Sequence, residues 1–385
     1  MIRVAVVSVA RSDYSIIKPV LLKLYKDSDF KVDFYVSGMH LSKKFGYTIK
    51  EIEQDKIKIR DKLNTNFDSD TKFSISKSIS KGVLKYAEVY EKNRPDLLII
   101  TGDRFEMLAA VIASIPYNIV IAHLRGGELT YGAFDDSIRH SITKFSHIHF
   151  CTTKDHAKRI NQMGEEKYRI KIVGCPSLDN IKNMNFLSLK ELSVKYNIII
   201  KTKPILVTYH PSTKHPETTQ NDIQELIRAL EKFNQTIIFT APNADTNNNI
   251  IDKKIRSFCK MKKQAFYIKN LGTVNYYSLL KVALIMVGNS SSGISEAASF
   301  KLPVINIGDR QQGRSTSKNV INCKEFDYKL IVKKINVGIT NSFRKKIKNN
   351  IYQRNKTSIN IVNYLKKLFY KPNILNKKFV RLKNG

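Results

Sequence analysis

The chain has 385 residues, which is more than one compact hydrophobic core usually supports, so we expect two domains. Hydrophobic residues make up 42% of the sequence and aromatic residues 10%, and this composition excludes a disordered chain. The formal net charge of +33 would suit a nucleic-acid-binding protein, but the lysines are scattered, so we expect them on solvated faces and expect no nucleic-acid partner.

Short runs of β-branched residues alternate with helical stretches along the whole chain. The first series of predicted strands covers residues 2–9, 31–38, 96–103, 118–126, 147–153 and 169–174. The second series covers residues 204–211, 235–243, 265–271, 284–291, 303–308 and 319–323. Helices are predicted at residues 15–27, 221–234, 294–301 and 358–371. This alternation predicts parallel sheets with crossover helices, so the expected fold class is α/β with two Rossmann-like doubly wound domains.

The boundary between the two domains is expected near residues 175–198, after one strand series and before the next. We therefore expect an N-terminal domain at 1–180, a C-terminal domain at 181–357, and a helix with a basic tail at 358–385 that packs back on the N-terminal domain. Ligands of open α/β sheets bind beyond the carboxyl ends of the strands. Two such domains predict a GT-B-like architecture with the binding site in the interdomain cleft.

Neither a membrane segment nor a disulfide framework is expected. The most apolar stretch, residues 107–124, is interrupted by Pro116, and the first residues lack a signal-peptide layout. The four cysteines lie far apart and form no CxxC pair, which is typical of neither a zinc site nor a disulfide-rich protein. These features predict a cytoplasmic protein without a membrane partner.

The sequence "GNSSSGISE" at residues 288–296 places small polar residues between a predicted strand and a predicted helix. Backbone N–H groups and the hydroxyls of Ser290 and Ser291 can point at a phosphate near the positive end of that helix. Glu296 lies one turn further on, where it can accept hydrogen bonds from ribose hydroxyls, and Arg310 can add positive charge. The alternative is a serine N-cap on an ordinary helix.

In the first predicted domain, charged residues follow two neighbouring strands. Asp103 and Arg104 end one strand, and Glu128, Asp135 and Asp136 lie in the loop after the next. Several carboxylates around one pocket suit general acid–base catalysis, because their neighbours can give them different pKa values. The alternative for Asp135 or Asp136 is a cap on the following helix.

His210 ends the first strand of the second series, where it can be either a substrate ligand or a structural residue. No close cluster of His, Asp and Glu stands out in the sequence. The sequence therefore predicts no metal site.

The informative motifs together resemble those of a known family. They are "RSDYSIIKPVL", "VSGMHLSKKFGYTIKEI", "GDRFEMLAA", "GGELTYGAFDDSIRHSITKFSHIHFC", "GCPSLD", "YHPST" and "GNSSSGISEAASFKLPVINIGDRQQGR". Over nearly its whole length the chain is similar to the hydrolysing UDP-N-acetylglucosamine 2-epimerases of sialic-acid biosynthesis and their relatives in legionaminic-acid pathways. The resemblance implies loss of the proton at sugar C2 with departure of UDP, giving a 2-acetamidoglucal that water converts to N-acetylmannosamine. It also implies a nucleotide-sugar substrate, a homo-oligomer, and no requirement for a metal or redox cofactor.

The resemblance also implies roles for individual residues. The residues that would hold the diphosphate and nearby groups are Arg11, Ser15, Arg104, His210, Ser290, Ser291 and Arg310. Glu296 would bind the ribose, and Asn243 would line the nucleotide side. Asp103, Glu128 and Asp135 would be the candidates for acid–base catalysis.

One position departs from the family pattern. Many relatives have a catalytic Glu two residues after a His, where this sequence has Arg125 in "HLRGGE". We hypothesise that Glu128 takes that role. The loop also has one residue more between "GGE" and "DD" than animal-type members, so the choice between Asp135 and Asp136 stays open.

Four alternatives to a hydrolysing UDP-N-acetylglucosamine 2-epimerase remain at the level of sequence. The same reaction can act on a 2,4-diacetamido-2,4,6-trideoxy hexose, and the base can be GDP instead of UDP. A two-domain glycosyltransferase shares the expected architecture, but it would need an acceptor. A non-enzymatic sensor would bind a nucleotide sugar without turnover.

Overall fold

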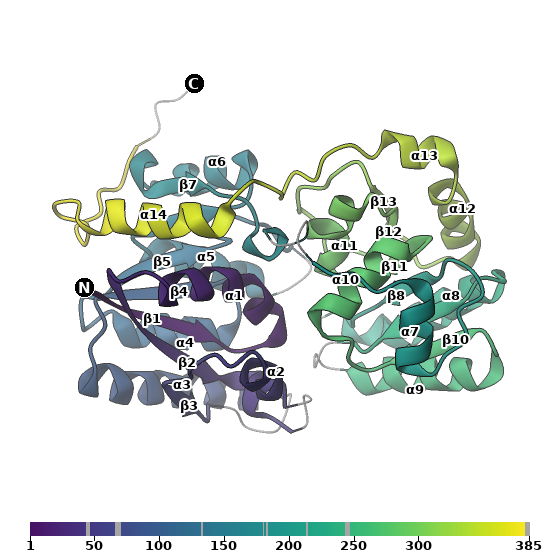
Figure 1. The fold of residues 1–385 in the computed structure, drawn as a ribbon, viewed down its shortest axis with the longest axis horizontal. Helices are drawn as coiled ribbons and strands as arrows, with labels where there is room; N and C mark the ends of the chain where they lie inside the picture. The colour runs from purple at the N-terminus through teal and green to yellow at the C-terminus, as the bar shows by residue number, and fades with distance from the viewer. Residues whose placement is uncertain are drawn as a thin grey trace. The chain divides into compact units, whose positions relative to one another are not determined.

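The structure, a computed structural model, describes residues 1–43, 47–65, 71–131, 134–179, 181, 184–212, 215–242 and 247–381. The chain divides into two compact units (Figure 1). Unit 1 comprises Met1–Glu128, Asp135–Ile181 and Tyr352–Gly385, and unit 2 comprises Leu129–Phe134 and Lys182–Ile351. Each unit is built on one parallel β-sheet with helices, which confirms the predicted α/β fold class.

The sheet of unit 1 has the strand order β3-β2-β1-β4-β5-β6-β7, and every paired neighbour is parallel. Its strands are β1 (Ile2–Ser8), β2 (Phe30–Ser37), β3 (Asp61–Leu63), β4 (Leu97–Thr101), β5 (Val120–Leu124), β6 (Ile148–Cys151) and β7 (Ile170–Ile172). All six strands predicted for this part of the chain are present. Strand β3 is not predicted from the sequence, because this edge strand has only three residues and two of them are exposed. The strand order changes direction between β1 and β4, which is where ligands bind in open α/β sheets.

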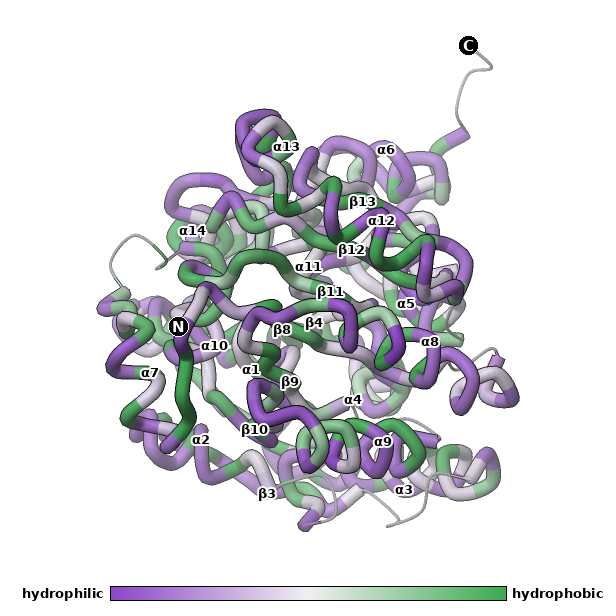
Figure 2. Tube along the Cα trace, turned by 90° about the vertical axis from the view of Figure 1, so that its right-hand side faces the viewer, coloured by the Kyte–Doolittle hydropathy of each residue, from purple (hydrophilic) through white to green (hydrophobic). Residues whose placement is uncertain are grey.

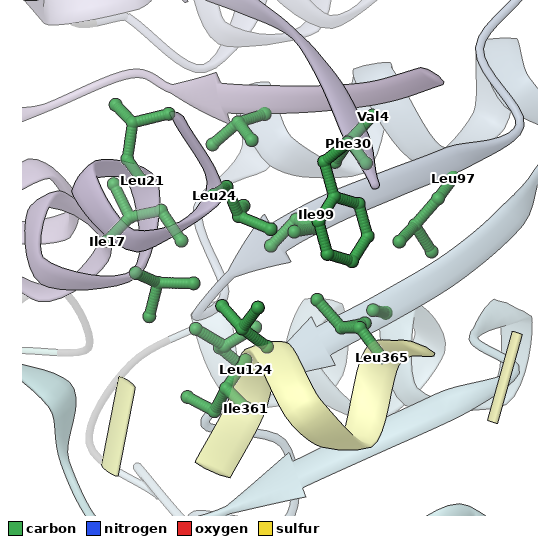
Figure 3. Packing of buried hydrophobic residues seen from close by; sticks show 14 of the residues in the cluster. Val4, Ile17, Leu21, Leu24, Phe30, Leu97, Ile99, Leu124, Ile361 and Leu365 are labelled. Atoms are coloured by element: carbon green, nitrogen blue, oxygen red, sulfur yellow. The ribbon is translucent and has the colours of Figure 1, made fainter. Parts of the chain in front are cut away.

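Helices cover both faces of this sheet. They are α1 (Arg11–Tyr25), α2 (Ile49–Gln54), α3 (Lys72–Lys92), α4 (Phe105–Ser114), α5 (Asp135–Phe145), α6 (Lys154–Gln162) and α14 (Thr357–Phe369). Figure 3 shows Ile17 of α1 and Ile361 and Leu365 of α14 packed in one buried cluster with Ile99 of β4. A second cluster, with Tyr86 of α3, contains side chains of α3, α4 and the same sheet. The chain therefore returns at its end to complete the core of unit 1.

The sheet of unit 2 has the order β10-β9-β8-β11-β12-β13 and is also parallel. Its strands are β8 (Ile205–Thr208), β9 (Ile237–Thr240), β10 (Ala265–Ile268), β11 (Ile285–Gly288), β12 (Val304–Ile307) and β13 (Val320–Cys323). The six strands of the second predicted series match these six. The β-branched and aromatic residues in these short runs explain why the prediction worked, because such residues pack well on a pleated buried surface.

The helices of unit 2 are α7 (Leu189–Tyr196), α8 (Thr219–Glu231), α9 (Asn248–Met261), α10 (Gly272–Val282), α11 (Ser291–Ser295), α12 (Tyr328–Gly338) and α13 (Asn341–Lys346). Hydrophilic and hydrophobic residues alternate along the turns of α8 and α9 (Figure 2), and the buried ones in α8 include Ile223 and Leu226. The prediction of one continuous helix at residues 294–301 is wrong. The chain instead forms the five-residue α11 and a separate 3-10 turn at Ala297–Phe300, because serines and Gly293 stabilise a continuous helix poorly.

In the part of the chain that the structure describes, no helix combines the length and the apolar character that crossing a lipid bilayer requires.

Candidate active site

In unit 1, acidic and basic side chains meet where β4 and β5 end. Asp103 follows β4, Glu128 follows β5, and Arg139 comes from α5. The Arg139 guanidinium donates a hydrogen bond to the Asp103 carboxylate, and its NH1 atom lies 3.7 Å from Oε2 of Glu128. The side chain of Arg139 is only 2% exposed. We call Asp103, Arg125, Glu128 and Arg139 the carboxylate cluster.

Arg125 is the closest partner of Glu128 in this cluster. Its Nε and NH2 atoms donate to the two carboxylate oxygens at 2.8 and 2.9 Å. Thr152 adds a hydroxyl 3.4 Å from Oε1, and Glu128 is completely buried. Arg125 itself has a φ of 65°, an uncommon left-handed conformation for a residue other than glycine. Arg125 stands where many relatives have a catalytic Glu. It therefore binds Glu128, the residue that we hypothesised to take the role of that Glu.

Asp135 and Asp136 both lie in the first turn of α5. Carboxylates are favourable there because the N-terminal turn of a helix carries partial positive charge. Oδ2 of Asp136 lies 3.5 Å from Nε2 of His140, one turn further along the helix. Burial lowers the pKa of His140, and the neighbouring Asp136 opposes that effect. Asp135 and Asp136 are the first two helical residues of α5, so neither is the N-cap residue that the alternative interpretation predicts.

The loop between β1 and α1 is fixed by a buried aspartate that the sequence analysis did not single out. Asp13 accepts hydrogen bonds from the Ser8 hydroxyl and, at 2.8 Å, from the backbone N–H of Ala10. Nε2 of His40 lies 3.0 Å from the Ser8 oxygen, and Nδ1 lies 2.8 Å from the Thr48 hydroxyl. Burial raises the pKa of Asp13 to about 7 despite these hydrogen bonds. The sequence signal for this network was an acid soon after a strand end, in "ARSDYS".

Three predicted substrate-binding residues of unit 1 lie near this network. Arg11 is exposed at the start of α1, and Ser15 follows one turn later, with its hydroxyl donating to the Ser12 carbonyl at 3.0 Å. Arg104 makes two hydrogen bonds to Glu106, at 3.1 and 3.3 Å, and its charge also lowers the pKa of Asp13. The ends of β1 and β4 therefore carry all three residues.

In unit 2, the loop after β11 is joined to the loop after β8. The Oδ1 atom of Asn289 accepts from the backbone N–H of His210, and its Nδ2 atom donates to the carbonyl of the same residue, both at 2.8 Å. Gly288, just before, has a φ of 138°, and a Cβ atom there would meet the carbonyl oxygen of Thr208 at 2.0 Å. His210 is 5% exposed. At position 288, the ends of β8 and β11 therefore lie too close together for any residue that carries a Cβ atom.

The three consecutive serines lie directly after Asn289. Ser290 is the N-cap of α11, and its hydroxyl lies 3.0 Å from that of Ser292. Ser291 begins the helix and is half-buried. Glu296, just after α11, accepts a hydrogen bond of 2.6 Å from the Ser295 hydroxyl and is 8% exposed. The N-cap interpretation therefore holds for Ser290, although the helix that it caps has only one turn.

The loop after β12 contacts the backbone of Asn289. Nε2 of Gln311 donates to the Asn289 carbonyl at 2.8 Å, and NH1 of Arg310 lies 3.4 Å from the same oxygen. Within unit 2, His210, Ser290, Ser291 and Arg310 are thus brought together, with Glu296 at the end of the same short helix. Asn243 lies outside the described residues.

A family model described as UDP-N-acetylglucosamine 2-epimerase matches residues 22–366. The chain belongs to this family. It is therefore an enzyme of the 2-epimerase type, as the sequence predicts.

Three similar proteins illustrate the range of this 2-epimerase family. A Campylobacter jejuni protein named GDP/UDP-N,N'-diacetylbacillosamine 2-epimerase (hydrolyzing) is 40% identical over 83% of this chain and 84% of its own length. A Legionella pneumophila protein named UDP-N,N'-diacetylbacillosamine 2-epimerase (hydrolyzing) is 36% identical over 97% of this chain and 98% of its own. A Neisseria meningitidis UDP-GlcNAc 2-epimerase, solved with UDP-GlcNAc bound, matches with a TM-score of 0.82 at 18% identity, covering 95% of this chain and 100% of that one, and supports the fold.

Arg139, Asn289 and Gln311 make contacts beside the candidate site residues that the sequence does not predict. All three stand inside quoted motifs, but nothing in their spacing shows that they bind neighbouring loops instead of a ligand. Among the described residues, no group of three or more His, Cys, Asp or Glu side chains is arranged to hold a metal ion.

Proposed function

We propose that this protein is a hydrolysing 2-epimerase that acts on a UDP- or GDP-linked 2,4-diacetamido-2,4,6-trideoxy hexose of the N,N'-diacetylbacillosamine type. The observation that carries the proposal is the identity of 40% and 36% to the two relatives named for that reaction, over 83% and 97% of this chain. The sequence motifs alone favour UDP-N-acetylglucosamine, which is the second candidate here. A Neisseria meningitidis protein named UDP-N-acetylglucosamine 2-epimerase, 31% identical over 84% of this chain, supports that second candidate.

The proposed reaction has two stages. A base removes the proton from sugar C2 while the C1–O bond to the diphosphate breaks, and UDP or GDP leaves with that bonding pair. The product of this stage is a sugar with a double bond between C1 and C2. Water then adds its hydroxyl to C1, and C2 receives a proton on the opposite face. The sum is nucleotide sugar plus water giving the free 2-epimeric sugar and the nucleoside diphosphate.

For unit 1 we propose that Asp103 and Asp135 serve the proton transfers and that Arg11, Ser15 and Arg104 bind the diphosphate. The side chain of Asp103 is 20% exposed, whereas that of Glu128 is 1% exposed with both oxygens hydrogen-bonded to Arg125. Asp103 is therefore the member of the carboxylate cluster better placed to meet a sugar. Glu128 remains a candidate, and near-normal turnover of Glu128→Gln would remove it.

For unit 2 we propose that the serines, His210 and Arg310 bind the nucleotide diphosphate and that Glu296 binds the ribose. What supports this assignment is the convergence of the loops after β8, β11 and β12 on Asn289. Hydroxyl groups and a guanidinium are the donors that phosphate oxygens favour. We also assign Asn243 to the nucleotide side, on the resemblance alone.

The test is proton NMR of the purified protein in deuterated water, with each substrate offered separately. Release of the free 2,4-diacetamido sugar carrying deuterium at C2, together with UDP or GDP, would support the proposal. Turnover of UDP-N-acetylglucosamine alone, with deuterated N-acetylmannosamine, would replace the first candidate by the second. Absence of turnover with all of these nucleotide sugars would contradict a 2-epimerase function for either sugar.

A further inference from the structure

Asn289 uses its polar atoms to bind protein instead of pointing them at a ligand. Its side chain makes the paired hydrogen bonds to the backbone N–H and C=O of His210, both at 2.8 Å. Its own N–H donates to the Thr208 carbonyl at 3.2 Å, which continues the parallel pairing of β8 and β11 by one residue. Its carbonyl accepts from Gln311 at 2.8 Å. The residue is 3% exposed.

These bonds join three loops that leave neighbouring strands. In the sheet order, β8, β11 and β12 stand side by side, and their following loops carry His210, the serines and Arg310. The side chain of Asn289 contacts the loop after β8 at His210. Asn289 directly precedes the serines of the loop after β11, and its backbone carbonyl contacts the loop after β12 at Arg310 and Gln311. A substitution at Asn289 removes the two side-chain bonds to His210 but keeps the backbone carbonyl that Gln311 and Arg310 contact. Its direct effect therefore falls on the link between the loop after β8, with His210, and the loop after β11, with the serines.

We propose that Asn289 is a positioning residue that sets the geometry of the diphosphate-binding groups of unit 2. This inference rests on the proposed function, since it concerns the same ligands. An amide is required because only a side chain with a donor and an acceptor on one planar group can pair with both polar atoms of one backbone residue. Aspartate has the same shape, but it places an oxygen against the His210 carbonyl, where the amide places a donor.

The test compares Asn289→Asp and Asn289→Ala with Asn306→Ala. Asn306 is a matched control, because it is a buried asparagine of the neighbouring β12 whose Nδ2 donates to Asn322 at 2.9 Å within the sheet. Asn289→Ala is expected to lower the melting temperature because the buried backbone of His210 loses two hydrogen bonds, whereas Asn306→Ala removes one bond to the exposed Asn322 and is expected to cost less. Only the Asn289 variants are expected to weaken UDP binding, by about ten-fold or more in calorimetry. In turnover, KM is expected to rise more than kcat falls.

A second readout needs no ligand. The ring signals of His210, assigned in histidine-labelled protein by their loss in His210→Gln, are expected to shift in Asn289→Asp and to stay in place in Asn306→Ala. If the wild-type protein binds neither UDP nor GDP, the proposed function fails, and the His210 signals alone decide the inference. Folded Asn289 variants with unchanged His210 signals, or with wild-type affinity for UDP, would overturn it.

Discussion

At the scale of single residues, Arg139 connects the two carboxylates of the carboxylate cluster. Its guanidinium bonds Asp103 and lies 3.7 Å from Glu128, in a site where the arginine is almost inaccessible to water. Removing one member of a buried ionic group leaves its partners desolvated and uncompensated, which costs about 3–5 kcal/mol. This cost is far larger than that of an exposed pair, because water screens the latter.

We therefore expect Arg139→Met to lower the free energy of unfolding by about 3 kcal/mol or more. The matched control is Lys85→Met, which breaks the exposed Lys85–Glu88 pair of α3 and should change stability by less than about 1 kcal/mol. Urea unfolding followed by circular dichroism measures both. Equal effects of the two substitutions would show that Arg139 does not act as an ionic bridge.

Asp13 gives the stability of the protein a specific dependence on pH. Burial raises its pKa to about 7 from an ordinary value of 3.8, so the folded state holds a proton on Asp13 that the unfolded state has lost. The contribution of protonated Asp13 to the free energy of unfolding is fully present below about pH 4 and is lost as the pH rises through about 7. His40, which faces the same network, has its pKa lowered to about 3 by burial, so it stays neutral over this window.

The substitution Asp13→Asn removes this titration. We expect the stability of the wild type relative to Asp13→Asn to fall between pH 4 and pH 7, by up to about 4 kcal/mol. Arg104, the charged neighbour, is common to both proteins. Urea unfolding of the two proteins at several pH values measures the difference. A constant difference from pH 4 to pH 8 would show that Asp13 does not titrate in this range.

At the scale of secondary-structure elements, the sequence predicted what local chemistry decides. The composition of runs such as 284–291 is enough to predict buried strands, and all twelve expected strands are present. It could not predict that β3 exists, because three residues carry no period. Nor could it predict that Asn289 binds His210, since 79 positions separate them and only the pairing of β8 with β11 brings them together. Positions at strand ends were thus predictable, whereas partners across strands were not.

The close approach of β8 and β11 depends on Gly288. A Cβ atom there would lie 2.0 Å from the Thr208 carbonyl oxygen, a backbone atom that cannot move alone. Gly102, at the end of β4, is a matched control because it also has a positive φ, 78°, but would meet nothing within 4 Å. We expect Gly102→Ala to cost about 1–2 kcal/mol through backbone strain and Gly288→Ala to cost clearly more. Thermal unfolding compares the two, and equal losses would exclude a steric role for Gly288.

At the scale of the whole molecule, the two units have separate hydrophobic clusters but are not separate stretches of chain. Ile361 and Leu365 of α14 belong to the core of unit 1, so that unit is complete only when the last part of the chain is present. Residues 129–134 group with unit 2, where the Arg314 guanidinium donates to Thr130 at 3.3 Å. The sequence analysis expects residues 358–385 to pack on the N-terminal domain, but the strand series carries no signal for the grouping of residues 129–134 with unit 2, because that grouping depends on long-range packing.

This organisation leads to a prediction about ligand-induced stability. A ligand that binds only the folded state stabilises it by about 2.7 kcal/mol at a concentration of 100 times its Kd. If the proposed diphosphate ligands are correct, UDP should raise the melting temperature more than uridine does at the same concentration, because uridine lacks the groups that the serines and Arg310 would bind. Where calorimetry resolves two transitions, UDP should move the transition of unit 2 more than that of unit 1. An equal shift with uridine would place the binding energy on the nucleoside and contradict the assignment of Ser290, Ser291 and Arg310 to the diphosphate.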